Sequence, residues 1–296
     1  MMFASVKQSG VAVNAPRRLR GASRLARSRA NRAAVRCEAG KDEKLPKLPK
    51  SPREQVGQAA EAVRRAAADG NKQLAIEFTL PLIGATDLDD WPGGIQQQFK
   101  AAAPLVEEIL RSVKREPGLE GRIEPRFLDR GDAVGLWEGE GVSCVLFPTG
   151  GTLPAAIDAS ERSRLTLVVN PQWNAGGLEA ANVFSEFGFG ARRRRCEAFV
   201  ESLGPETFYL QQTRISGENL QVVRRYPEPY QVVVNTFEGE TFVLAAAEAE
   251  RPSYSRLEEL CKARPGSVAA MDFVQRLQYE IEWTKRDAYK NPNGPQ

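Results

Sequence analysis

The sequence has no histidine among its 296 residues. A Ser-His-Asp or Cys-His nucleophilic system depends on an imidazole as its general base, so both systems are excluded. Zinc sites built on cysteine and histidine, facial iron triads and haem with a histidine axial ligand are excluded as well. Acid–base chemistry near neutral pH would need a retuned carboxylate, lysine, tyrosine or cysteine. Carboxylate-based, lysine-based or phosphate-binding chemistry stays open, and so does a protein without catalysis.

Long apolar runs and paired cysteines are also lacking. No stretch approaches the roughly 18 consecutive apolar residues typical of a transmembrane helix, so no such helix is expected. The four cysteines, Cys37, Cys144, Cys196 and Cys261, include no C-x-x-C pair, and a disulfide scaffold is not expected at this density. Two interpretations of the last three stay open: ordinary reduced thiols, or a redox switch between two of them.

Acidic residues are missing from the first 37 residues, which carry Lys7 and eight arginines. A basic segment rich in alanine and serine, without an apolar core, is typical of an organelle transit peptide. Residues 35–39 resemble a plastid processing site of algae and plants. We therefore expect a chloroplast transit peptide over residues 1–37, and a basic nucleic-acid-binding arm is the alternative.

Removal of residues 1–37 would leave 32 basic and 38 acidic residues. An acidic chain argues against a general nucleic-acid binder, because such binding draws its affinity from basic residues that release counterions. We therefore expect no nucleic-acid partner. Residues 38–50 are charged and contain two prolines, which predicts a flexible lead-in, and residues 290–296 are expected to be a disordered tail.

From residue 51 the pattern alternates between helices and strands. Ser51, Pro52 and Glu54 form a capping box with proline at the first helical position, which predicts a helix over 51–70. The elements expected next are a strand at 74–80, a helix at 95–113 that Pro104 splits or restarts, a weak strand at 122–129, strands at 142–147 and 165–169, and helices at 153–163 and 178–203.

The last third of the chain begins with consecutive strands. They lie at 207–215, 220–226, 230–237 and 240–247, with tight connections, and predict an antiparallel meander. Helices at 254–263 and 266–289 follow, and the second has two apolar faces. This order predicts an α/β fold: a mixed sheet with helices on both faces, a C-terminal antiparallel meander and a long C-terminal helix. We expect a single domain over residues 51–289.

Two strand ends carry groups that could bind a ligand. The candidate ligand-binding residues are Thr149, Gly150, Gly151, Thr152, Asn170 and Trp173. The first four precede a helix, where free N–H groups could cradle a phosphate, although the spacing is not that of a P-loop. The other two end the next strand, where open α/β sheets bind ligands. The alternatives are a simple loop turn and a turn with a packed tryptophan. No catalytic residue, metal site or cofactor is indicated.

Two further segments could contact a partner. The candidate partner-binding residues are Arg192, Arg193, Arg194, Arg195, Tyr226 and Tyr230. On a helix the first and last arginines share a face, so the four cannot clamp one phosphate together. The arginines could meet anionic lipid, a phosphate or an acidic partner, and a solvated basic turn is the alternative. The tyrosines flank a turn set by two prolines, for which a rigid structural corner is the alternative.

Five segments, taken in order, resemble a plastid family known as domain-of-unknown-function family number nineteen-ninety-five. The segments are VLFPTGG (145–151), VVNPQW (168–173), VFSEFGFG (183–190), FVESLGPETFYLQQTRISG (199–217) and RRYPEPYQV (224–232). The resemblance covers about residues 51–250, and the long helix at 266–289 extends beyond the family core. It departs from the family at Tyr230, where the family often has tryptophan.

The resemblance implies a chloroplast protein of green algae and plants. One branch of the family includes the low-photosystem-II-accumulation assembly factor, and another version is fused behind a chloroplast adenylate kinase. The family offers no established catalytic residues. We therefore expect a non-enzymatic accessory factor, in the stroma or peripheral on thylakoids, that contacts a photosystem II subunit or assembly factor. The alternative is a nucleotide- or phosphometabolite-binding α/β protein with transferase or hydrolase activity.

Overall fold

The computed structural model describes residues 47–82, 91–174, 189–236, 240–279 and 281. Contacts divide the chain into Met1–Arg36 and Cys37–Gln296, and every described residue belongs to the second unit. The expected transit segment, most of the lead-in and the tail lie outside the described residues.

The helices and strands follow the predicted alternation. In chain order they are α1 (Pro52–Ala68), β1 (Gln73–Glu77), α2 (Gly94–Val113), β2 (Glu124–Asp129), β3 (Val134–Glu138), β4 (Val142–Leu146), α3 (Leu153–Arg162), β5 (Leu165–Val169), the 3-10 helix η1 (Gln172–Asn174), α4 (Gly190–Leu203), β6 (Phe208–Ile215), β7 (Glu218–Arg225), β8 (Tyr230–Asn235), β9 (Thr241–Glu248), α5 (Tyr254–Ala263) and the 3-10 helix η3 (Val268–Ala270). A C-terminal helix covers residues 273–279 and 281.

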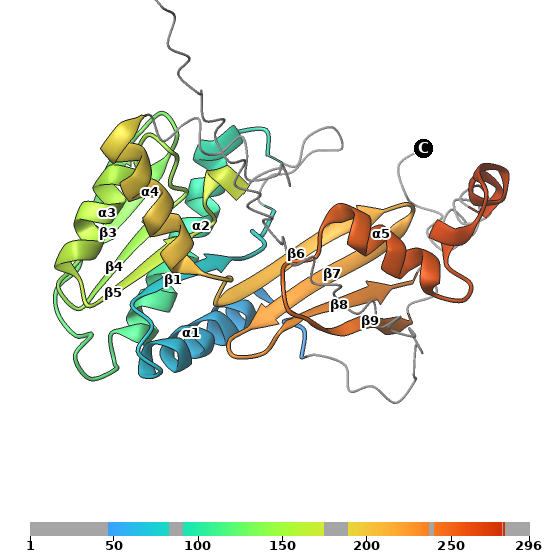
Figure 1. The fold of residues 1–296 in the computed structure, drawn as a ribbon, viewed down its shortest axis with the longest axis horizontal. Coiled ribbons are helices and arrows are strands. Elements are labelled where there is room, and N and C mark those ends of the chain that lie inside the picture. Colours follow the sequence, from blue (N-terminus) through green and yellow to red (C-terminus); the bar gives the residue numbers. More distant parts are fainter. Residues whose placement is uncertain (1–46, 83–90, 175–188, 237–239, 280, 282–296) are drawn as a thin grey trace, which may run out of the picture. The chain divides into compact units, whose positions relative to one another are not determined.

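One nine-stranded sheet connects all of these strands, in the order β2-β3-β4-β5-β1-β6-β7-β8-β9 (Figure 1). Four central strands, β4, β5, β1 and β6, run parallel to one another. The strands on either side pair antiparallel. The predicted mixed sheet is therefore confirmed, with the antiparallel meander formed by β6 to β9.

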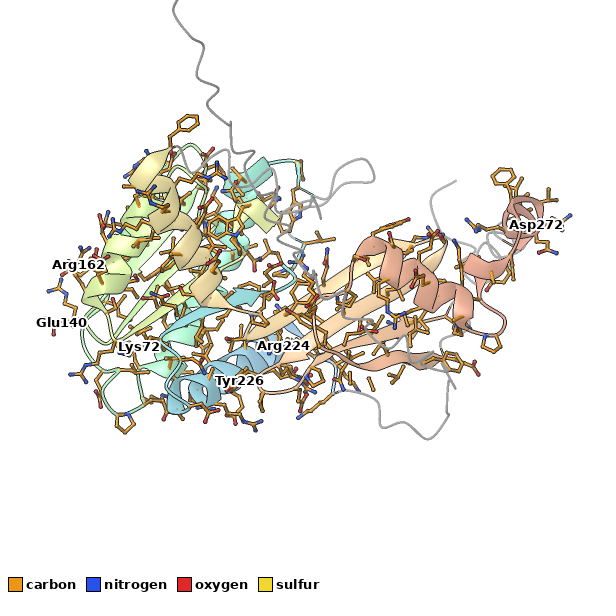
Figure 2. The ribbon with its side chains drawn as sticks, viewed as in Figure 1. Lys72, Glu140, Arg162, Arg224, Tyr226 and Asp272 are labelled. Atoms are coloured by element: carbon orange, nitrogen blue, oxygen red, sulfur yellow. The ribbon has the colours of Figure 1, made fainter. Side chains whose placement is uncertain are left out.

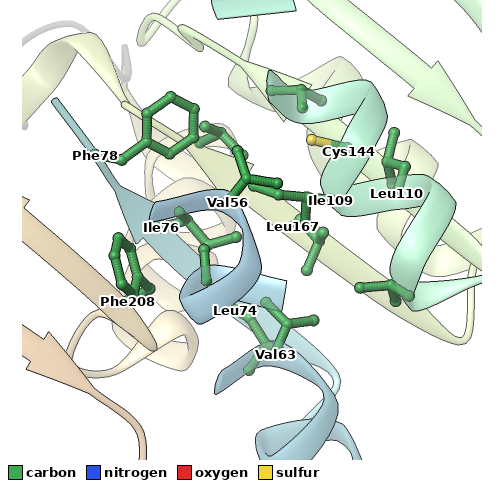
Figure 3. Close-up of a cluster of buried hydrophobic side chains, with 14 of the residues drawn as sticks. Val56, Val63, Leu74, Ile76, Phe78, Ile109, Leu110, Cys144, Leu167 and Phe208 are labelled. Atoms are coloured by element: carbon green, nitrogen blue, oxygen red, sulfur yellow. The ribbon is translucent and has the colours of Figure 1, made fainter. Parts of the chain in front are cut away.

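Helices cover both faces of the parallel part, as predicted. On one face α1 and α2 pack on alternate side chains of the central strands, among them Ile76, Leu167 and Phe208 (Figure 3). On the other face α3 and α4 pack on the intervening residues, among them Ala75 and Val168. The central strands are buried on both sides, which explains why β4 and β5 are apolar at almost every position.

A separate apolar cluster lies where α5 packs on the antiparallel meander. It includes Tyr209, Leu220 and Val232 from the strands and Leu260 from α5. Ser216 and Gly217 connect β6 to β7, and both have positive φ angles, 50° and 90°. Two consecutive left-handed residues define the tight hairpin turn that suits the strand twist, so β7 begins at Glu218, earlier than its predicted start.

The structure corrects two predictions for the first half of the chain. Strand β3 was not expected, because its five residues include Gly135 and lack a clear alternation. Helix α2 also runs through Pro104 without a break, contrary to the predicted split. Pro104 is exposed, so water can bind the carbonyl that loses its helical partner and the helix tolerates the proline.

The prediction of a helix over 266–289 is also wrong for the first residues of that range. Residues 268–270 form a 3-10 helix instead, and the C-terminal helix begins only after Asp272. The carboxylate of Asp272 accepts from the Gln275 backbone at 2.8 Å, and Gln275 Oε1 accepts from the Asp272 backbone at 3.2 Å. This reciprocal cap sets the start of the helix. Part of the predicted helix 178–203, before α4, lies outside the described residues.

Gly141 lies where no side chain fits. A Cβ atom there would come within 2.5 Å of the Leu119 carbonyl carbon and oxygen, and backbone atoms cannot move aside cheaply. We expect Gly141→Ala to lower the free energy of unfolding by about 1–3 kcal/mol through overpacking. Urea unfolding followed by circular dichroism measures the change. Gly57→Ala, on the exposed side of α1 with open space around it, is the control and should stabilise by about 0.5–1 kcal/mol.

Candidate functional site

The sheet has a topological switch between β1 and β5. The two strands are parallel neighbours, yet α2 follows β1 on one face and α4 follows β5 on the opposite face. In open α/β sheets the crevice beyond the carboxyl ends of two such strands is the usual ligand site. The predicted residues Asn170 and Trp173 follow β5 at this edge.

Asn170 occupies this crevice with its own side chain. Its Oδ1 accepts from the Phe78 backbone N–H at 2.9 Å, and its Nδ2 donates to the Phe78 carbonyl at 2.9 Å. The residue has a left-handed φ of 44°, a conformation that asparagine tolerates well. The amide therefore extends the pairing of β1 and β5 beyond the strands, and both polar atoms of its side chain are bonded to the backbone of Phe78.

The next candidate segment, at the start of α3, is locally satisfied. The Thr149 backbone donates to Thr152 Oγ1 at 2.9 Å, and the two hydroxyls lie 3.2 Å apart. The Thr149 carbonyl accepts from the backbone of Leu153 at 3.1 Å, so this residue begins the helical hydrogen bonding. Gly150 and Gly151 form the first turn between the threonines, and Gly151 is exposed. The two hydroxyls therefore bond within this turn, while the predicted role of its backbone N–H groups in binding a phosphate stays a prediction.

The side chains after Asn170 also bind within the protein. Gln172 donates from Nε2 to the carbonyls of Phe147 at 2.9 Å and Asp132 at 3.0 Å. Trp173 is partly buried against the apolar cluster under α3 and α4. The structure thus brings the segments 149–152 and 170–173 to one sheet edge, where their side chains join strands to loops.

The arginine run lies on the first turns of α4. Arg195 bonds to Asp158 and Glu161 at 2.7 Å each, which ties α4 to α3, and Arg193 pairs with Glu197 at 2.7 Å. Arg192 and Arg194 are exposed and form no ion pair with a described residue. Phe189, just before the helix, is 90% exposed. Two of the four predicted arginines therefore remain available at the surface, next to an exposed aromatic ring.

The two tyrosines of the proline corner lie in different environments. Tyr226, labelled in Figure 2, donates its hydroxyl to Asp69 at 3.0 Å and links the corner to the end of α1. Tyr230 is only 1% exposed and its hydroxyl bonds to Glu206. The Tyr230 side chain lies inside the protein, an arrangement that matches the alternative of a rigid corner.

A cluster of partly buried charges was missed by the sequence analysis. Arg251, after β9, bonds to Glu77 at the end of β1 at 3.1 Å and to Glu206 before β6 at 3.3 Å. Its guanidinium also lies 4.7 Å from the centre of the Tyr209 ring, which packs edge-on against Tyr230. These residues are far apart in the sequence and only the sheet order brings them together.

The ionisation of this charge cluster is set by burial and by its charges. Burial opposes the charge of Arg251, but Glu77, Tyr209 and Glu206 outweigh it and hold its pKa above the ordinary value. Burial raises the pKa of both Tyr209 and Tyr230, so the two phenols stay neutral at physiological pH. The charge cluster is therefore a fixed arrangement of one cation between two carboxylates.

The C-terminal helix turns its apolar side outward. Its exposed fractions are 77% for Phe273, 61% for Val274, 48% for Leu277 and 46% for Ile281. Arg276, on the other side, donates toward the carbonyls of Ala269 and Met271. The sequence predicted two apolar faces here, with Phe273 off the stripe of Val274, Leu277 and Ile281, and the structure exposes side chains of both.

Some site types are not found in the described part of the chain. No group of three or more cysteine, aspartate or glutamate residues there could hold a metal ion. Within the same residues, no helix combines the length and apolarity needed to cross a bilayer.

Cys144, Cys196 and Cys261 are free and buried. Burial raises the pKa of all three thiols, to about 11 for Cys261. A thiol needs its thiolate form to react or exchange, so these groups are poorly placed for redox chemistry in the folded state.

The nine-stranded sheet and the helices on its faces define an α/β protein built on one mixed sheet. The profile of the family described as Domain of unknown function (DUF1995) matches residues 49–259, more than half of the chain, and the chain belongs to this family. No match was found among curated proteins or among solved structures. The resemblance inferred from the five segments is confirmed for the family, while its link to photosystem II remains a prediction.

Replacement of the central cation should destabilise the fold. Arg251→Met removes the cation that bonds to the half-buried carboxylates of Glu77 and Glu206, and we expect a loss of about 1–2 kcal/mol in the free energy of unfolding, between that of an exposed and of a buried pair. Urea unfolding measures it. The control is Arg65→Met, which removes an exposed pair with Glu61 and should cost less than about 0.5 kcal/mol. Equal losses in the two variants would contradict a structural role for Arg251.

The buried thiols should resist alkylation in the folded protein. With a pKa of about 11, only about one Cys261 in a thousand is a thiolate at pH 8. We expect iodoacetamide at pH 8 to modify Cys144, Cys196 and Cys261 only after unfolding in urea, as measured by peptide mass spectrometry. Rapid native-state labelling, or a disulfide between any two of them in the protein treated with an oxidant, would instead support the redox switch.

Proposed function

We propose that this protein is a non-enzymatic accessory factor that docks onto a partner protein through the outward apolar face of its C-terminal helix. The observation that carries this proposal is the exposure of Phe273, Val274, Leu277 and Ile281 on one helix. Their spacing of one, four and eight residues places them on one side. An amphipathic helix normally buries such a side, so an exposed one indicates an interaction site.

The chemistry of this face favours a protein groove. A helix that lies on an anionic lipid surface usually carries lysine or arginine along its polar side. Here Arg276 points back to the carbonyls of Ala269 and Met271 and is not offered to a membrane surface. Apolar anchors at helical spacing match the mode in which a helix docks into a hydrophobic groove of another protein.

A second contact surface is electrostatic. Arg192 and Arg194 form no ion pair with a described residue, and Phe189 is exposed beside them. These groups suit an acidic protein surface, and such a contact weakens as salt screens the charges. A peripheral association with thylakoids would follow from either surface if the partner is a thylakoid complex.

The identity of the partner rests on the family and on the first 37 residues. Their basic, acid-free composition supports import into the chloroplast stroma. The family resemblance supports a photosystem II subunit or one of its assembly factors as the partner. Among the described residues, the amide of Asn170 at the sheet switch is already bonded to the Phe78 backbone, which favours a role in assembly over the nucleotide-binding alternative.

The test is affinity purification of the tagged protein from isolated chloroplasts. We expect photosystem II core or assembly subunits to co-purify with the natural sequence. The double variant Phe273→Ser, Leu277→Ser should lower their recovery by about tenfold or more, since each apolar anchor contributes about 1–2 kcal/mol when buried. Quantitative mass spectrometry measures the recovery.

The control is the variant Gln278→Ser on the same helix, whose side chain is also exposed and takes no part in the cap at Asp272. It replaces a good helix former by serine and should keep the partner. Equal recovery with the double variant and this control would rule out the apolar face as the docking surface. A protein that purifies without any partner, with a bound phosphorylated compound instead, would favour the alternative function.

A further inference from the structure

An open groove of about 450 Å³ lies between the second half of α2 and the strands β2 and β3. Its walls are apolar and come from Leu110 of α2, Ile123 and Pro125 at the start of β2, and Trp137 of β3. A groove of this volume is in the range of small-molecule binding sites. It lies apart from the C-terminal helix and from the sheet switch, and no function has been assigned to it above.

The local structure explains why these side chains converge. Pro125 lies opposite Trp137 in the antiparallel pair of β2 and β3, so both side chains point to the same face of the sheet. On α2, the positions 107, 110, 111 and 114 form one side of the helix and border the groove. The groove is thus built on regular elements.

Trp137 contributes a hydrogen-bond donor that the protein does not use. The residue is only 6% exposed, and its Nε1 is buried without a hydrogen-bond partner in the described structure. Phe99 stacks on the indole at 6.2 Å between ring centres, with planes 14° apart. A buried N–H without an acceptor is unfavourable, and an acceptor brought in with a ligand would relieve this cost.

The rim of the groove carries charge of both signs. Arg111 pairs with Glu108 on the solvent side of α2. Lys114, at the end of the helix, forms no ion pair with any described residue, and neither does Glu107. The lysine offers a positive charge to a ligand, while Glu107 opposes a second negative charge. One anionic group is therefore the best match to the rim.

We propose that this groove binds a small amphiphilic monocarboxylic acid. The apolar part lies against Leu110, Ile123, Pro125 and Trp137, and the carboxylate accepts a hydrogen bond from Lys114. A carboxylate oxygen also supplies the acceptor that Trp137 Nε1 lacks, once the indole turns toward the open side of the groove. The binding involves no covalent step.

The test follows the indole N–H resonances of the full-length protein by nitrogen-15 NMR. The chain has four tryptophans, and the variant Trp137→Phe identifies the resonance of Trp137. Octanoate is the probe, and 1-octanol, which has the same chain without the charge, is the comparison. We expect octanoate to shift the Trp137 resonance saturably and 1-octanol to bind more weakly.

The charge at the rim is tested with a matched pair of variants on α2. Lys114→Gln should raise the dissociation constant of octanoate about threefold, since an exposed charge pair has this modest effect. Lys100→Gln, on the same helix but away from the groove, should leave it unchanged. An unmoved Trp137 resonance at millimolar octanoate, or equal affinities in the two variants, would overturn the proposal.

Discussion

The ion cluster of Glu77, Arg251 and Glu206 joins the two halves of the sheet. Glu77 ends the parallel strand β1, and Glu206 precedes β6, the strand where pairing changes from parallel to antiparallel. Arg251 comes from the connection between β9 and α5 and binds both carboxylates. The α5 helix itself packs on the meander through apolar side chains such as Leu260. A partly buried cation thus links the end of the parallel part of the sheet to the meander.

The polar side chains at the usual ligand position of the sheet bond within the protein. The Asn170 amide bonds to Phe78 at the switch between β1 and β5, and the threonines before α3 bond to each other. Elsewhere the described structure exposes apolar side chains on the C-terminal helix and arginines on α4, and it has a groove beside Trp137.

Several elements could be predicted because the signals are local. The capping residues before α1 and the alternation in β6 to β9 each depend on residues near one another in the chain, and the observed bounds lie within a few residues of those predicted. Strand β3 was missed because a short strand with a glycine has no distinct pattern. The candidate site was only partly predictable: the segments 149–152 and 170–173 do meet at one edge, but their hydrogen bonds run to distant backbone atoms such as Phe78.

The sequence alone determined the absence of histidine chemistry, the alternation of helices and strands, the meander and the family. These follow from composition and from patterns over a few residues. The tertiary structure decided which side of the C-terminal helix faces solvent, that Tyr230 is buried, and that Glu77, Glu206 and Arg251 meet. Amphipathic spacing shows that a helix has an apolar and a polar side, but not what each side touches. Contacts between residues more than a hundred positions apart depend on the order of strands in the sheet, and no local sequence pattern contains that order.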